Sequence, residues 1–177
     1  MQLKFAESKF KELILYISHK AEPKNLGAIK LNKILWYSDM LSYLLFEKPI
    51  SGETYIKRQY GPVPKHILAV IDQLVASGDM CMRDTNYFGY AKKEHLPLRK
   101  PDLSAFSADE ISIVDNIIDT ICEGHTATSI SEHSHDRIWE LAEIGEEIPY
   151  NTIFASQLGE IDEFDIQWSQ QIMEKVA

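Results

Sequence analysis

The stretch that decides the fold runs from residue 27 to residue 46 and reads GAIKLNKILWYSDMLSYLLF. Its apolar residues recur at spacings of three and four, which is typical of one face of an α-helix. That face comprises Leu31, Ile34, Leu35, Leu41, Leu44 and Leu45, and Trp36, Tyr37 and Tyr43 widen it. Such a wide apolar stripe predicts a helix that is buried on nearly all sides, at the centre of the fold.

The segments around this helix predict a winged-helix-like order of elements in the first half. An amphipathic helix precedes it over residues 3–17, and residues 53–60 are rich in strand-forming side chains. Residues 61–64, Gly-Pro-Val-Pro, predict a turn that starts a helix ending at Gly78, since proline is tolerated in a first helical turn. A β-hairpin is predicted from residues 80–83 and 88–92, joined by Asp84-Thr85-Asn86.

Capping signals organise the second half. Ser107 and Glu110 form a capping box that opens a helix ending at Gly124. Ser129 and Glu132 predict a second box, and a further helical stretch follows from Asp136 towards Gly145. A final helix is expected within residues 150–177, with Ile166, Trp168 and Ile172 on its apolar face. The predicted fold class is therefore mostly α (α+β): a compact helical domain with a small antiparallel sheet or hairpin.

Charge is divided unevenly along the 177 residues. The chain has 18 Lys+Arg and 27 Asp+Glu, for a net charge of −9. Residues 1–100 carry 16 basic and 10 acidic side chains, whereas residues 101–177 carry 2 and 17. Hydrophobic residues make up 45%, which excludes a disordered or collagen-like chain. The acidic back half favours a basic partner or simple solubility.

The sequence also indicates the compartment. It contains no run of about 18 apolar residues, so no membrane-spanning helix is expected. Its first twenty residues are too charged for a signal peptide. Cys81 and Cys122 are expected to be buried thiols rather than a disulfide. Together these features predict a cytoplasmic protein.

Motifs for catalysis or cofactor binding are missing from the sequence. There is no nucleophile elbow and no glycine-rich phosphate loop. His125, His133 and His135 invite a zinc interpretation, but a helical pair needs a spacing of four residues. We expect His133 to be exposed and His135 to cap the next helix or to bond locally. The prediction is no catalytic residue, no metal, no cofactor and no enzyme; a hydrolase or metal enzyme is the weakest alternative.

Two kinds of macromolecular recognition remain. A winged-helix-like half would place the helix from Pro62 to Gly78 in the major groove of DNA, yet it offers only Lys65 and His66 as readers. Aromatic and arginine side chains gather on the β segments, which indicates protein recognition once some are assigned to the core. They are Tyr55, Arg58, Tyr60, Tyr87, Phe88 and Tyr90.

A set of short motifs follows in order along the chain: KLNKILWYSD at 30–39, PISGE at 49–53, YGPV at 60–63, SEHSH at 131–135 followed by Trp139, and IPY at 148–150. This ordered set resembles the SocA/Panacea antitoxin domain. The likeness covers about residues 5–155. It implies a mostly helical antitoxin module, also found in phage-associated proteins, that neutralises a toxin encoded nearby by binding it. Some members act as adaptors that deliver a partner to a protease.

The candidate partner-binding residues are Arg58, Tyr60, Gly61, Pro62, His135 and Trp139. Arg58 and Tyr60 flank a constrained turn and are the better candidates for exposed contacts. Gly61 and Pro62 have either a structural or a contact role. His135 and Trp139, four residues apart, share a helical face and either dock this segment onto the core or contact the partner.

The predicted organisation is one antitoxin-like domain over residues 1–155 and an acidic C-terminal extension over residues 156–177. The extension is expected to be helical and packed on the same domain. Residues 140–177 hold nine acids and one lysine, so a basic partner would first be sought there. The sequence leaves the toxin and the oligomeric state open, and DNA binding or a protease adaptor role stays as the alternative.

Overall fold

A computed structural model describes residues 4–87 and 89–157 of the chain. Helices and strands alternate irregularly along it. In chain order they are α1 Glu7–Lys20, α2 Ala28–Phe46, β1 Tyr55–Arg58, β2 Gly61–Pro64, α3 Ile67–Ala76, β3 Met80–Tyr87, β4 Tyr90–Pro97, α4 Ala108–Gly124, α5 Ala127–His133, α6 Arg137–Leu141, β5 Glu147–Ile148 and α7 Thr152–Gln157. This content confirms the predicted fold class, mostly helical with a small antiparallel sheet.

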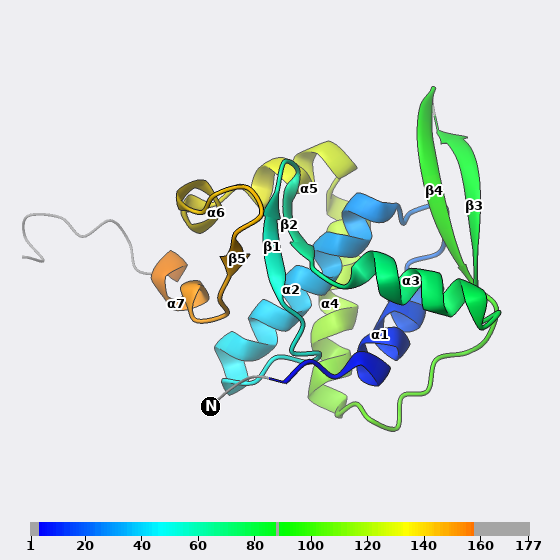
Figure 1. Cartoon of the computed structure of the whole chain (residues 1–177), viewed down its shortest axis with the longest axis horizontal. Helices are drawn as coiled ribbons and strands as arrows, with labels where there is room; N and C mark the ends of the chain where they lie inside the picture. The colour runs from blue at the N-terminus through cyan, green and yellow to red at the C-terminus, as the bar shows by residue number, and fades with distance from the viewer. Residues whose placement is uncertain (1–3, 88, 158–177) are drawn as a thin grey trace, which may run out of the picture.

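Helix α2 lies at the centre, as its apolar stripe predicts (Figure 1), but Leu45 of that stripe, near the end of the helix, is 57% exposed. It packs against α1, α4, α5 and β2. Its buried apolar residues are Leu31, Ile34, Leu35, Trp36 and Met40. Polar side chains on the same helix are also buried, and the sequence pattern does not predict this: Lys33, Ser38, Asp39 and Ser42.

Strand β2 corrects one prediction. Residues 61–64 do not start a helix; they pair antiparallel with β1, and α3 begins only at Ile67. The sheet order is β2-β1-β5, so β2 is an edge strand. An edge strand tolerates Pro62 and Pro64 because one row of its backbone groups needs no N–H donor in the ladder. A residue that precedes proline also favours extended geometry.

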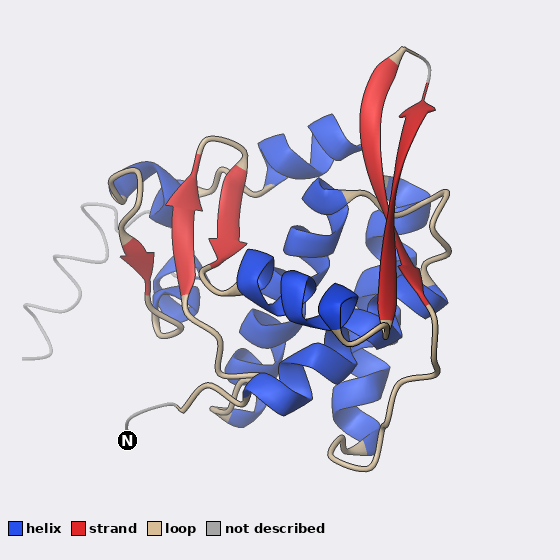
Figure 2. Ribbon diagram, turned by 45° about the vertical axis from the view of Figure 1, so that its right-hand side comes forward, coloured by secondary structure: helices blue, strands red, loops and turns tan. Residues whose placement is uncertain are grey.

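The β3–β4 hairpin exists as predicted but is longer. Its strands pair from Met80↔Pro97 to Tyr87↔Tyr90, so residues 84–86 are strand rather than turn. The turn falls at Gly89, whose φ of 88° suits glycine and whose N–H donates to the Asn86 side chain at 2.7 Å. The hairpin projects from one side of the helical body, and the three-stranded sheet lies on the other side (Figures 1 and 2).

Helices α4, α5 and α6 of the second half begin beside residues whose side chains accept free backbone N–H groups of the first turn. The Ser107–Glu110 capping box opens α4 as predicted. The Ser129–Glu132 box is wrong, because Ser129 instead closes a box with Thr126 and α5 starts at Ala127. Helix α6 is only five residues long and is capped by Asp136, which accepts the N–H of Trp139 at 2.9 Å.

Two further predictions concern the cysteines and the chain end. Both cysteines are free; Cys122 is half-buried, but Cys81 is exposed, contrary to expectation. Successive side chains of a strand point to opposite faces, so Cys81 faces out because its neighbour Met80 is in the core. The helix expected around Ile166, Trp168 and Ile172 lies outside the described residues, as does nearly all of the acidic extension.

Candidate partner-binding site

The turn between β1 and β2 presents the candidate contact residues. Arg58 pairs with Gly61 across the turn, and residues 58–61 are called the Tyr60 turn below. The side chain of Tyr60 is 58% exposed and that of Arg58 is exposed. Aromatic and arginine residues dominate binding hot spots, so the exposed Tyr60 and Arg58 are candidate contact residues.

A buried lysine lies directly beneath this turn. Lys33 on α2 is 1% exposed, and its ammonium donates a hydrogen bond to the Pro62 carbonyl oxygen at 3.1 Å. Burial lowers the pKa of Lys33 to about 7. A lysine this deeply buried is rare without an acidic partner, because burial removes the hydration of its charge.

Gly61 is the residue that makes room for this lysine. Its φ of 96° is in the region that favours glycine, and a Cβ placed there would overlap the Lys33 ammonium and the Ser134 hydroxyl. Gly61 and Pro62 are buried. In this structure both residues therefore shape the turn from within, while Arg58 and Tyr60 face outward.

Helix α5 holds the other side of the turn through two buried serines. The Ser131 hydroxyl donates to the Tyr60 carbonyl at 3.0 Å, and the Ser134 hydroxyl donates to the Ser131 carbonyl at 2.7 Å. We call Lys33, Gly61, Pro62, Ser131 and Ser134 the lysine cluster. It fixes the backbone of the Tyr60 turn from α2 and α5 at once.

His135 and Trp139 stack on each other next to the turn. Their ring centroids are 3.7 Å apart with an interplanar angle of 10°. The Trp139 indole N–H donates to the Arg58 carbonyl at 3.2 Å, and the Lys57 ammonium lies 4.0 Å from the Trp139 ring centroid. Burial is the main cause that lowers the pKa of His135, followed by the charge of Lys33. The structure thus brings all six predicted site residues to one place, although His135 precedes α6 and Asp136 provides the helix cap.

The segment that carries Trp139 also exposes apolar side chains. Lys57 donates to the Ala142 carbonyl at 2.9 Å, and Gly145 donates to the Lys57 carbonyl at 2.9 Å, so this segment runs along the end of β1. Leu141 and Ile144 on it are 74% and 64% exposed. Exposed apolar groups on a segment that borders β1 are suited to contact with a protein surface.

A second buried polar cluster lies further along α2, and the sequence did not predict it. The Asp39 carboxylate is fully buried and accepts hydrogen bonds from the Ser51 N–H, the Ser51 hydroxyl, the Tyr55 hydroxyl and the Tyr150 hydroxyl. Tyr150 also donates to the Glu53 carbonyl at 2.6 Å. We call Asp39, Ser51, Glu53, Tyr55 and Tyr150 the aspartate cluster. Burial raises the pKa of Asp39, and these hydrogen bonds oppose that rise.

The available signal for both clusters was in the motifs themselves. Lys33, Asp39, Ser51, Glu53 and Ser131 all stand in the short stretches that carry the family resemblance. A polar residue that stands between apolar neighbours in such a stretch indicates a role in hydrogen bonding inside the fold. Apolar periodicity alone could not reveal it.

Helix α3 offers little to DNA. Its sequence, ILAVIDQLVA, contains no lysine or arginine. Lys65 and His66 precede the helix and bind carboxylates: Lys65 pairs with Glu147 at 2.8 Å, and His66 Nδ1 lies 2.7 Å from Glu53 Oε1. A helix that reads DNA needs cations on its exposed face, so the geometry favours protein recognition.

The histidines of the late motif separate in space. His133 is exposed, with its ring 5.7 Å from that of His125, while His135 turns to Trp139. Among residues 4–87 and 89–157, no group of three or more His, Cys, Asp or Glu side chains is arranged to hold a metal ion.

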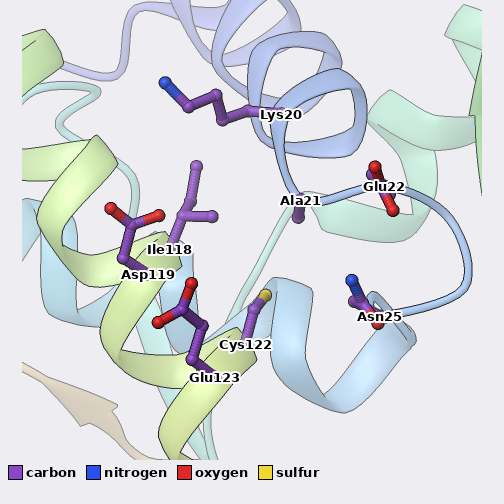
Figure 3. Close-up of a pocket in the computed structure, with 8 residues that line it drawn as sticks. All are labelled: Lys20, Ala21, Glu22, Asn25, Ile118, Asp119, Cys122 and Glu123. Carbon is purple, nitrogen blue, oxygen red and sulfur yellow. The ribbon is translucent and has the colours of Figure 1, made fainter.

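A hollow of about 250 Å³ lies between the end of α1 and the end of α4 (Figure 3). Its wall includes Lys20, Glu22, Asp119, Cys122 and Glu123. Burial raises the pKa of the Cys122 thiol, which makes it a poorer nucleophile. The thiol in this hollow is therefore not activated for nucleophilic attack.

A family profile described as "Antitoxin SocA-like, Panacea domain" matches residues 31–140. The match covers more than half of the chain, which belongs to this family, as the ordered motifs predict. Comparison with curated proteins gives no match, and comparison with solved structures gives none. No helix in the described part of the chain is long and apolar enough to span a bilayer. Membership supports a toxin–antitoxin-type role in general, with a toxin as partner, and suggests a non-catalytic protein.

Proposed function

We propose that this chain neutralises a toxin by binding it directly, and that the Tyr60 turn with Trp139, Leu141 and Ile144 is the binding surface. The observation that carries the proposal is Tyr60 itself, an aromatic side chain 58% exposed on a turn whose backbone is fixed from below. A rigid turn loses little entropy when it binds, which favours affinity. Arg58 beside it supplies a planar donor group for the partner.

The side chains of this surface are suited to contact rather than to catalysis. Its outward groups are a phenol, a guanidinium and aliphatic side chains, which bury area rather than transfer protons. Glu140 and Glu143 are exposed on the same segment, so a toxin with a basic rim and an apolar centre would be complementary to it. The proposed place of action is the cytoplasm, which is supported by two cysteines that remain free thiols.

Co-expression with the protein encoded next to this chain tests the proposal. Wild type should restore growth in the presence of the toxin and should co-purify with it as a defined complex. Tyr60→Ala should weaken the affinity at least about tenfold, the size expected of a hot spot. Leu68→Ala is the matched control, because Leu68 is 75% exposed but lies on α3, and it should leave the affinity within about twofold.

Two outcomes would contradict the proposal. Toxicity that persists with the wild-type chain would exclude neutralisation, and equal affinities for Tyr60→Ala and wild type would exclude this surface. An adaptor role gives a different result: the purified toxin would stay active in the complex, and its cellular half-life would shorten only when a protease is present.

A further inference from the structure

Lys33 is a buried cation with few hydrogen-bond partners. Its ammonium has three donors, and the Pro62 carbonyl is its only hydrogen-bond acceptor among the described residues. No carboxylate pairs with it in that part of the chain. Burial of the charged ammonium is therefore unfavourable, and the neutral form of Lys33 lies closer to it in free energy than in water.

The groups that face Lys33 do not neutralise its charge. On its own helix, Lys30 is one turn earlier and Tyr37 one turn later, with a pKa that burial raises to about 12. Strand β2 contributes only backbone and apolar groups. From α5 and the link after it come Ser131, the Ser134 hydroxyl and His135, and Glu132 and His133 are exposed.

The position of Lys33 couples it to the contact surface. It holds Pro62, two residues after Tyr60, while Ser131 holds the Tyr60 carbonyl itself. Gly61 lies between these two anchors and against the ammonium. A hydrogen bond from an ammonium is stronger than one from a neutral amine, so loss of the proton loosens one of the two anchors.

We propose that Lys33 is the positioning residue of the Tyr60 turn, and that its proton controls how firmly the turn is held for the partner. The protonated lysine fixes the turn, and the neutral lysine lets it move. The statement about the turn stands on the contacts above; its consequence for toxin affinity rests on the proposed function. The lowered pKa of about 7 places the change near neutral pH.

The first experiment uses the full chain without a partner. Amide NMR signals of Gly61 and Val63 are followed from about pH 6 to pH 8.5 in wild type, Lys33→Met and His135→Asn. We expect a shared midpoint near pH 7 in wild type and His135→Asn, and its loss in Lys33→Met. Loss in His135→Asn but not in Lys33→Met would assign the proton to the histidine and overturn the proposal, as would a flat wild-type profile.

Direct observation of the lysine covers the case in which Lys33→Met does not fold. The Cε signal of Lys33 in the wild-type chain should titrate near pH 7. A midpoint above about pH 9 would overturn the proposal.

The second experiment measures affinity for the toxin at the same pH values. Between about pH 6 and pH 8.5, wild type should lose about fivefold in affinity, the range of one weakened hydrogen bond, and Lys33→Met should lose less than about twofold. Equal losses in both chains would overturn the link to binding. If Tyr60→Ala leaves the affinity unchanged, the proposed function fails at this surface, whereas the NMR titration of the free chain still decides the role of Lys33.

Discussion

The two buried polar clusters of α2 differ in how completely their charged group is satisfied. In the aspartate cluster, three residues supply four donors to the Asp39 carboxylate. In the lysine cluster, the Lys33 ammonium has one acceptor within the part of the chain that the structure describes. A buried network whose polar groups are all hydrogen-bonded holds parts of a fold rigidly together. A buried charged group with too few partners destabilises the folded state, because its lost hydration is not replaced. We infer that the aspartate cluster holds the fold rigidly, while the lysine cluster holds the Tyr60 turn, the proposed contact surface, less firmly.

The largest expected effect comes from removing the satisfied carboxylate. Asp39→Ala leaves the hydroxyls of Ser51 and Tyr55 without their acceptor in the core, whereas the Tyr150 hydroxyl keeps the Glu53 carbonyl. We expect a loss of about 3–5 kcal/mol in the free energy of unfolding, measured in urea. Asp119→Ala, at an exposed position, is the control and should change this energy by less than about 0.5 kcal/mol. A small effect of Asp39→Ala would show that the cluster is not a lock.

The next prediction tests the space above Lys33. Gly61→Ala adds a Cβ at a φ of 96° that also overlaps the Lys33 ammonium and the Ser134 hydroxyl. Gly145→Ala is a matched control, because its φ is 91° and nothing lies within 4 Å of the added carbon. Both variants carry the backbone strain of alanine at a positive φ. We therefore expect Gly61→Ala to be less stable than Gly145→Ala by about 1–3 kcal/mol, because of the overlap. Equal losses in the unfolding energy would mean that Lys33 and Ser134 move aside freely.

The comparison also predicts a dependence on pH. The pKa of Lys33 is lowered in the folded chain to about 7, whereas an unfolded lysine titrates near 10.5. Between these values the unfolded chain binds more protons, so stability rises with pH, by at most about 1.4 kcal/mol per pH unit from this group.

Lys33→Met removes this group and isolates its contribution. The variant should be more stable than wild type at pH 7, and the difference should shrink as the pH rises towards 10. Lys93→Met, at an exposed site on β4, should keep the wild-type slope. A constant difference between Lys33→Met and wild type across this range would contradict the prediction.

These contrasts also show what the sequence could predict. The centre of the fold was predictable because α2 carries a stripe of apolar residues wide enough to require burial. The stacking of His135 on Trp139 agrees with their predicted proximity, but the shared helical face does not exist, because His135 lies before α6. Exposure of Arg58 and Tyr60 followed from their place beside a constrained turn.

Other features depended on contacts between distant segments. Residues 61–64 carry the proline signal of a helix start, and only pairing with β1 makes them an edge strand. Lys33 has a side chain that normally lies at the surface, and its burial depends on β2 and α5, about 30 and 100 residues further along the chain. Periodicity within one helix cannot report such partners.

The smallest expected effect concerns the hydrogen bond from the half-buried Trp139 indole to the Tyr60 turn. Trp139→Phe keeps a ring for His135 to stack on and for Lys57 to approach, but it removes the indole N–H that donates to the Arg58 carbonyl. The Arg58 carbonyl can bind water instead, because the turn is at the surface. We therefore expect a loss of only about 0.5–1 kcal/mol in the free energy of unfolding.

The matched variant is Tyr150→Phe, which also removes one donor but does so in the buried aspartate cluster. There the Glu53 carbonyl loses its 2.6 Å hydrogen bond at a buried position, and Asp39 loses one of its donors. We expect a loss of about 1–3 kcal/mol, measured by the same urea titration. If Trp139→Phe costs more than Tyr150→Phe, the turn rather than the aspartate cluster is the rigid part of this molecule, because a surface hydrogen bond would then contribute more to stability than a buried one.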